Sequence, residues 1–146
     1  NCLMTYAVFD IGGTKTRVGV SSDLKKLDKI YDFKTPHTFE DGMKKMSESI
    51  SKLSEGKKVT AIAGGIRGLL MEDKSGIEND KQLARWAGKS VVATLKKNFK
   101  CVKSKFSWHN ALRLWYTVGI FTNIRDRKKK DGTSGMGLYC VLMLLV

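Results

Sequence analysis

Residues 10–17 read Asp10-Ile11-Gly12-Gly13-Thr14-Lys15-Thr16-Arg17, with a pair of glycines between two runs of strand-forming residues. The runs, residues 6–11 and 16–20, are rich in β-branched and aromatic side chains, and the second alternates in polarity, which is typical of a strand. Glycine adopts turn conformations without steric cost. The segment therefore predicts a β-hairpin with a carboxylate, Asp10, at the end of its first strand.

The same turn is suited to binding phosphate. Glycine has no Cβ, so backbone N–H groups at Gly12 and Gly13 can approach a polyphosphate closely. Thr14 adds a hydroxyl and Lys15 a positive charge, and Asp10 offers the hard oxygen ligands that Mg2+ prefers. An ordinary hairpin with glycines in its turn explains the spacing equally well. On spacing alone, both interpretations stand.

The remaining pattern predicts an α/β domain. A third strand is expected over residues 29–34, and a helix begins near residue 39 with one apolar stripe. The stripe consists of Met43, Met46, Ile50 and Leu53. A strand over residues 58–63 is expected to enter a second glycine turn at 64–68, and a further amphipathic helix follows Lys89. A hairpin followed by crossovers predicts a mixed sheet with flanking helices.

The composition indicates a folded protein, and its charge is unevenly distributed along the chain. The 146 residues are 42% hydrophobic, contain one proline and carry a net charge of +13. Such a chain can bury a core and is neither disordered nor low in complexity, and its length suggests one domain. The charge is uneven, since residues 1–100 hold 19 basic and 12 acidic side chains and residues 101–146 hold 8 and 2.

The cysteines and the apolar segments favour a soluble cytoplasmic protein. Cys2, Cys101 and Cys140 form an odd, widely spaced set that indicates neither a disulfide framework nor a zinc site. No signal peptide opens the chain, and the apolar run at residues 137–146 is shorter than the roughly 20 residues that span a bilayer. We expect no membrane partner, and self-association through this apolar C-terminus.

Three motifs in order identify a resemblance. Besides residues 10–15, they are Ala63-Gly64-Gly65-Ile66-Arg67-Gly68 and Leu83-Ala84-Arg85-Trp86-Ala87-Gly88-Lys89. Over residues 4–101 the chain resembles the N-terminal lobe of the ROK family of sugar kinases and related repressors. The resemblance implies an actin-like ATPase fold, which is ribonuclease-H-like, with ATP and Mg2+ as cofactors and a hexose or acetylated aminohexose as acceptor. No winged-helix segment precedes the hairpin, so the DNA-binding repressor branch is not favoured.

The resemblance also assigns roles to individual residues. Its first phosphate motif is matched by Asp10, Gly12, Gly13, Thr14 and Lys15, with Asp10 as the metal ligand. Its sugar-contacting positions are matched by Gly64, Gly65, Gly68 and Asn79, with Arg67 in place of the usual proline. We interpret Arg67 as a solvent-facing arginine at a turn, with donation to a sugar hydroxyl as the alternative, and Trp86 as a core anchor.

The catalytic base that the resemblance calls for is missing, so the catalytic residue stays unassigned. In the family it is the aspartate of a Glu-Asn-Asp segment after the second helix, whereas Glu78-Asn79-Asp80 precedes that helix here. The expected position falls near His109 and Asn110, within an acid-free stretch from Lys81 to Arg125. Residues 102–146 are therefore an unmatched basic and aromatic tail, which indicates a truncated or frameshifted gene.

Two further interpretations compete with a sugar kinase. Residues 81–130 combine basic and aromatic side chains, which is typical of nucleic-acid binding through phosphate contacts and base stacking, but we favour an attempted core with solvated lysines. The other is a degenerate fragment with a folded N-terminal part. The predicted function is ATP-dependent phosphorylation of a sugar hydroxyl, with this chain a partial and inactive version.

Overall fold

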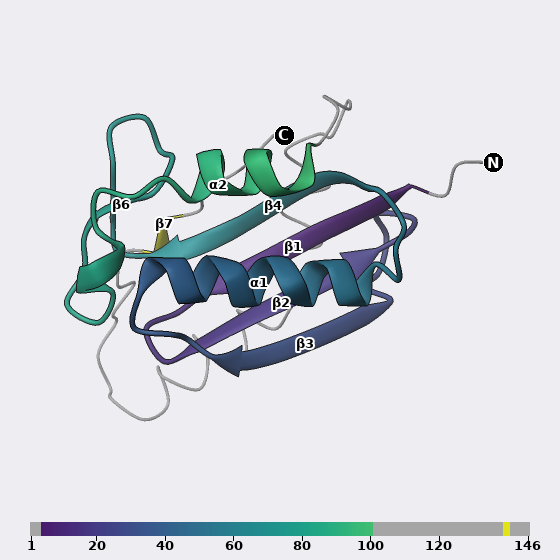
Figure 1. The fold of residues 1–146 in the computed structure, drawn as a ribbon, viewed down its shortest axis with the longest axis horizontal. Helices are drawn as coiled ribbons and strands as arrows, with labels where there is room; N and C mark the ends of the chain where they lie inside the picture. The colour runs from purple at the N-terminus through teal and green to yellow at the C-terminus, as the bar shows by residue number, and fades with distance from the viewer. Residues whose placement is uncertain (1–3, 101–138, 141–146) are drawn as a thin grey trace.

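The computed structural model describes residues 4–100 and 139–140, which form a five-stranded sheet with helices (Figure 1). The first three strands, β1 (Thr5–Ile11), β2 (Lys15–Ser21) and β3 (Lys29–Lys34), are consecutive antiparallel neighbours, which confirms the predicted hairpin. β4 (Val59–Arg67) runs parallel to β1, and β7 (Tyr139–Cys140) pairs antiparallel with β4. The order across the sheet is β3-β2-β1-β4-β7, so the predicted mixed sheet is confirmed.

Several predictions concern residues outside the described ones. They are the base position near His109 and Asn110, the part of the basic and aromatic region 81–130 that follows residue 100, and the apolar segment 137–146 apart from β7. These stay predictions.

Two helices cover one face of the sheet (Figure 1). α1 (Phe39–Leu53) begins at Thr38 and α2 (Val91–Phe99) at Ser90, and each of these side chains accepts a backbone N–H from the first turn of its helix. Such caps satisfy N–H groups that a helix N-terminus leaves unpaired. The predicted stripe of α1 is confirmed: Met43, Met46 and Ile50 are buried and Leu53 is partly buried. Within residues 4–100, no helix is long and apolar enough to cross a membrane.

The second glycine turn lies elsewhere than predicted. β4 does not end at Ala63 but continues through Gly64 and Gly65 to Arg67. These residues stay extended because they pair with β1, and a Cβ at Gly64 would lie 2.4 Å from Cγ of Phe9. The glycine at this position therefore makes room for the Phe9 ring. The chain turns after Arg67, at Gly68, whose φ of +125° favours glycine.

Three short elements between β4 and α2 were not predicted from the sequence. They are β5 (Leu69–Leu70), β6 (Ile77–Asn79) and the 3-10 helix η1 (Ala84–Trp86). β5 and β6 pair antiparallel with each other. Elements of two or three residues are too short for hydrophobic periodicity to reveal. They carry the chain around the end of the sheet where β4 finishes (Figure 1).

Trp86 anchors the segment between β4 and α2 to the core. Its side chain is 1% exposed, packs edge-on against Phe39 with ring centroids 5.4 Å apart, and donates from Nε1 to the carbonyl oxygen of Pro36 at 3.2 Å. Gly42 of α1 leaves space for the indole ring, because a Cβ there would lie 2.1 Å from Cζ2 of Trp86. The prediction of Trp86 as a core anchor is confirmed.

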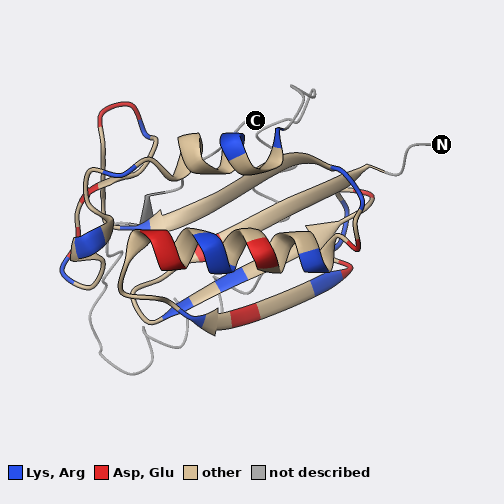
Figure 2. Cartoon of the chain, in the orientation of Figure 1, with Lys and Arg blue, Asp and Glu red and all other residues tan. Residues whose placement is uncertain are grey.

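Charge is spread unevenly over the elements (Figure 2). α1 and β3 carry several charged side chains, whereas β1 carries one, Asp10, and β4 carries one, Arg67. Both lie at or next to the carboxyl end of their strand. Because a charge in a central strand costs free energy unless it is paired or bound, these two residues are the first candidates for a function.

Candidate functional site

Asp10 is a buried carboxylate at the end of β1. Its neighbours Phe9 and Ile11 pack in the core under the helices, so by strand alternation Asp10 faces the opposite side of the sheet. Asp10 is 8% exposed, and its Oδ1 accepts no hydrogen bond from the described residues. Burial raises the pKa of Asp10 to about 6, although the charge of Arg17 on β2 acts in the opposite direction. A buried oxygen without a donor is available to a cation or a donating ligand.

The glycine turn after Asp10 is braced by its own backbone and by one threonine. The N–H of Gly12 donates to the carbonyl oxygen of Lys15 at 3.0 Å, so it is used within the turn rather than directed at a ligand, contrary to our expectation. Thr35 donates its hydroxyl to the carbonyl oxygen of Gly12 at 2.8 Å and its N–H to that of Thr14 at 2.9 Å. The Thr35 hydroxyl also lies 2.8 Å from that of Thr16. The sequence pattern gave no indication of this contact of Thr35.

The polar residues that follow the glycines are exposed. Thr14 lies at the tip of the turn with an exposed side chain. Nζ of Lys15 lies 3.1 Å from Oδ2 of Asp32 on β3, and both side chains are about half exposed. Exposed ion pairs contribute little to stability, so Lys15 can exchange Asp32 for another anion at small cost.

The predicted acceptor residues lie at the same end of the sheet. Gly65 is level with Asp10 in the pairing of β4 with β1, and Gly64 is level with Phe9; both glycines are buried. Asn79 is exposed at the end of β6, and its carbonyl oxygen would lie 3.0 Å from a Cβ at Gly68. The structure thus brings the phosphate motif and the acceptor positions together, but Gly64 and Gly65 lie within a strand rather than on a turn.

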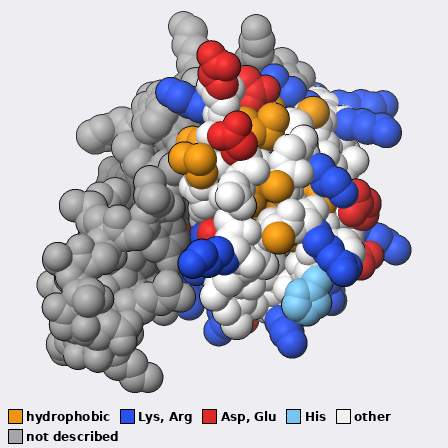
Figure 3. Space-filling view, turned by 90° about the vertical axis from the view of Figure 1, so that its left-hand side faces the viewer, with side chains coloured by type: hydrophobic (Ala, Val, Ile, Leu, Met, Phe, Trp, Pro, Cys, Tyr) orange, Lys and Arg blue, Asp and Glu red, His pale blue; other side chains and the backbone are white. Residues whose placement is uncertain are grey.

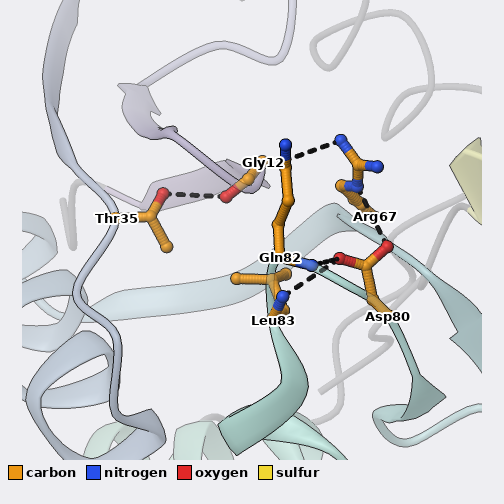
Figure 4. Close-up of polar contacts among 6 residues, drawn as sticks. All are labelled: Gly12, Thr35, Arg67, Asp80, Gln82 and Leu83. Atoms are coloured by element: carbon orange, nitrogen blue, oxygen red, sulfur yellow. Dashed lines mark hydrogen bonds and ion pairs between the residues drawn. The ribbon is translucent and has the colours of Figure 1, made fainter.

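Arg67 is held by an ion pair and is not the solvent-facing arginine that we predicted. Its Nε donates to Oδ2 of Asp80 at 2.9 Å, and its Nη1 donates to Oε1 of Gln82 at 2.9 Å (Figure 4). The other carboxylate oxygen of Asp80 accepts the N–H groups of Gln82 and Leu83 at 2.9 and 3.0 Å. The arginine and aspartate side chains are 30% and 10% exposed. The prediction was wrong because the antiparallel pair β5–β6 returns the chain to the end of β4 and so places Asp80 beside Arg67.

The same network leaves Asp80 firmly ionised. Burial acts to raise the pKa of Asp80, but the Arg67 guanidinium and the N–H groups of Gln82 and Leu83 outweigh it, so the pKa lies below its ordinary value. A carboxylate with a lowered pKa and three donors is a poor proton acceptor. Asp80 therefore positions its neighbours rather than acting as a base, as expected from the place of residues 78–80 before the second helix rather than after it.

Gln82 lies directly over the glycine turn. A Cβ at Gly13 would lie 1.8 Å from Oε1 and 2.7 Å from Cβ of Gln82, so the glutamine side chain is in contact with the turn. Beside it is a hollow of about 380 Å3 lined by His37, Gln82, Ala84 and Arg85. Figure 3 shows this end of the molecule, where blue Lys and Arg side chains and red Asp and Glu side chains lie around a centre of white and orange atoms. Sequence reasoning missed Gln82, because no local pattern marks a contact between segments so far apart.

The fold of the described residues is similar to that of solved sugar kinases. A ROK family glucokinase from Streptomyces griseus, in complex with glucose and AMPPNP, has a TM-score of 0.58 and 21% identity, and the match covers 66% of this chain and 31% of that one. The described part of the chain has the fold of ROK-family sugar kinases. A ROK hexokinase from Thermus thermophilus matches with a TM-score of 0.58 and 23% identity, covering 67% of this chain and 33% of that one.

A third solved structure also matches. An inorganic polyphosphate/ATP-glucomannokinase from Arthrobacter has a TM-score of 0.53 and 20% identity, with 67% of this chain and 42% of that one covered. The predicted fold class is confirmed by these matches, and the chain spans about a third of the length of the first two kinases. No protein-family model and no curated protein matches the chain.

Proposed function

We propose that this chain supplies the first phosphate motif and part of the sugar site of a ROK-type kinase, which transfers the terminal phosphoryl group of ATP to a hydroxyl of a hexose or acetylated aminohexose. The observation that carries the proposal is the buried Asp10 carboxylate beside the Gly12-Gly13 turn, in a fold that solved sugar kinases share. Asp10 is kept in a central strand at a cost in stability, which favours a role for it in binding.

Mg2+ fits the residues at this place. Oδ1 of Asp10 is a hard, buried oxygen to which no residue in the described part of the chain donates, and Mg2+ is usually bound by one or two carboxylates together with substrate phosphates and water. Within residues 4–100, no three or more potential metal ligands lie together, so Asp10 would share the ion with phosphate and water. Bound there, Mg2+ would neutralise negative charge on the transferring phosphoryl group.

The residues after Asp10 would orient the phosphates. The turn itself is held in shape by Thr35 and by the Gly12 N–H, so binding need not order it first. Thr14 offers an exposed hydroxyl, and Lys15 offers a cation whose present partner, Asp32, is half exposed. We propose that these two side chains donate hydrogen bonds to the phosphates of ATP.

The acceptor sugar is proposed to bind where β4 and β6 end. Asn79 is exposed there, and Arg67 has N–H donors beyond the two that Asp80 and Gln82 occupy. No described residue is assigned as the base that takes the hydroxyl proton, since Asp80 is committed to Arg67. A cytoplasmic location is part of the proposal, because an odd, widely spaced set of cysteines suits a reducing compartment.

Nucleic-acid binding through residues 81–130 is not proposed. The three solved structures named above are sugar kinases, and none of those names refers to a nucleic acid. Within residues 81–100, Trp86 is buried and Phe99 is partly buried against the core, so neither of these rings is an exposed stacking platform.

Magnesium-dependent nucleotide binding tests the proposal. We expect the 146-residue chain to bind AMPPNP in isothermal titration with Mg2+ and much more weakly with EDTA. Asp10→Asn, which removes the charge but keeps the size, should abolish the difference. Glu48→Gln is the matched control, because Glu48 is exposed on α1. Binding that is indifferent to Mg2+ in both the unaltered chain and Asp10→Asn would refute the assignment of Asp10.

Phosphorylation of a hexose by this chain alone is expected to be undetectable. The chain spans about a third of the length of the kinases that it matches, and no residue that we can place acts as the base. A coupled assay with glucose, ATP and Mg2+ measures it. Metal-dependent turnover by the purified chain would overturn this expectation.

A further inference from the structure

We infer that residues 79–83, held by Arg67, form a latch over the glycine turn, and that the latch opens when a phosphate group binds there. We call residues 79–83 the latch segment. The inference rests on the proposed function of the turn and adds a means of regulating it. Binding of phosphate is then linked to the position of the segment that carries the acceptor residue Asn79.

The first step of the argument is the contact itself. Gly13 has no side chain, and the space where a Cβ would stand is filled by Gln82, whose Oε1 would be 1.8 Å from that atom. A phosphate oxygen approaching Gly13 from this side meets the glutamine amide first. Because two groups cannot occupy one volume, Gln82 has to move before this face of the turn can be used.

The second step is how the latch is kept closed. Oε1 of Gln82 accepts a hydrogen bond from Nη1 of Arg67, and Asp80 accepts another from Nε of the same guanidinium. Arg67 is the last residue of β4 and one position beyond Ile66, which pairs with Ile11. Arg67 is therefore held by the central sheet, level with the start of the glycine turn. The latch segment connects β6 to η1; its Lys81 and Gln82 are exposed, and its Leu83 is buried in the core.

The third step is that the latch has somewhere to go. The hollow of about 380 Å3 beside η1 is lined by His37, Ala84, Arg85 and Gln82 itself, and it is larger than a glutamine side chain. The polar residues of the latch segment can move with Gln82 toward this hollow, while Leu83 and Trp86 stay anchored in the core. Opening then costs the hydrogen bond from Arg67 to Gln82 and the bonds from the N–H groups of Gln82 and Leu83 to Asp80, and it frees Nη1 of Arg67 beside the turn.

A direct test compares binding of inorganic tripolyphosphate to the full chain and its variants by isothermal titration. Gln82→Ala removes the obstructing side chain and its hydrogen bond, and should tighten binding about three- to tenfold, the equivalent of one net hydrogen bond. Gln82→Leu keeps the bulk without the acceptor and should show a smaller gain. Ser51→Ala, exposed on α1, is the control and should bind like the unaltered chain.

Amide hydrogen exchange supplies a readout that a merely structural glutamine would not move. In the unaltered chain, tripolyphosphate should speed exchange at the N–H groups of Gln82 and Leu83, which Asp80 holds in the closed latch. Equal affinity of the unaltered chain and Gln82→Ala, or binding without faster exchange, overturns the latch and leaves the proposed function intact. Absence of binding by both overturns the phosphate role of the turn, and the latch with it.

Discussion

Replacing Asp10 by asparagine is expected to change how the stability of the chain depends on pH. Asp10 is 8% exposed, and one of its oxygens has no hydrogen-bond donor among the described residues. Burial disfavours the charged form, so the folded chain holds the proton on Asp10 to a higher pH than the unfolded chain does. Asparagine has nearly the same shape and does not titrate, so it removes this dependence alone.

The sign and size follow from linkage. The pKa of Asp10 rises from 3.8 in a free carboxyl to about 6 in the folded chain. A raised pKa in the folded state means that the stabilising contribution is fully present below about pH 4 and is lost as the pH rises through about 6. At about 1.4 kcal/mol for each tenfold change, the loss is on the order of 3 kcal/mol. The unfolding free energy of Asp10→Asn relative to the unaltered chain should therefore rise by that amount from about pH 4 to about pH 7.5.

Urea unfolding at a series of pH values, followed by circular dichroism, measures this difference. Taking the difference between the two chains cancels every group that they share, and Glu48→Gln serves as the control carboxylate on the surface of α1. Mg2+ should reduce the difference near neutral pH, because a cation relieves the buried charge of Asp10. A difference between Asp10→Asn and the unaltered chain that stays flat with pH would refute the reasoning.

Three further substitutions test the packing and capping around the site. Gly64→Ala places a methyl group 2.4 Å from the Phe9 ring and should lower the unfolding free energy by about 3 kcal/mol or more; a urea midpoint like that of the unaltered chain would contradict the packing argument. Thr35→Val removes the hydroxyl that braces the glycine turn and should cost about 1–2 kcal/mol, with faster amide exchange in the hairpin; unchanged exchange would count against it. Ser90→Ala removes the cap of α2, which accepts the N–H of Ala93, and should cost about 1 kcal/mol in thermal unfolding, whereas an unchanged melting temperature would show that the cap contributes nothing.

Much of the fold could be predicted because its signals are local. The hairpin is marked by two glycines between strand-forming runs, and the stripe of α1 by apolar residues at helical spacing. The extension of β4 through Gly64 could not be predicted, since two adjacent glycines are typical of a turn. They remain extended here because β1 pairs alongside and Phe9 fills the space over Gly64.

The contacts of the candidate site were likewise predictable only where the residues are close together in the sequence. Asp10 and the glycine turn are contiguous in the chain, so their proximity follows from the sequence. Thr35 and Gln82 reach the turn from distant segments, and nothing near them in the sequence indicates that contact. Arg67 was predicted to face solvent because its partner, Asp80, follows two short strands that periodicity does not reveal.

By itself, the sequence determined that a carboxylate and two glycines sit at the tip of a hairpin in an α/β domain, because hairpin geometry and strand alternation depend on neighbours along the chain. The tertiary structure decided which of these groups are buried, paired or covered. Burial leaves Oδ1 of Asp10 without a donor among the described residues, Asp80 holds Arg67, and Gln82 covers Gly13. The physical reason is that desolvation and side-chain contacts depend on segments that meet only when the sheet has formed.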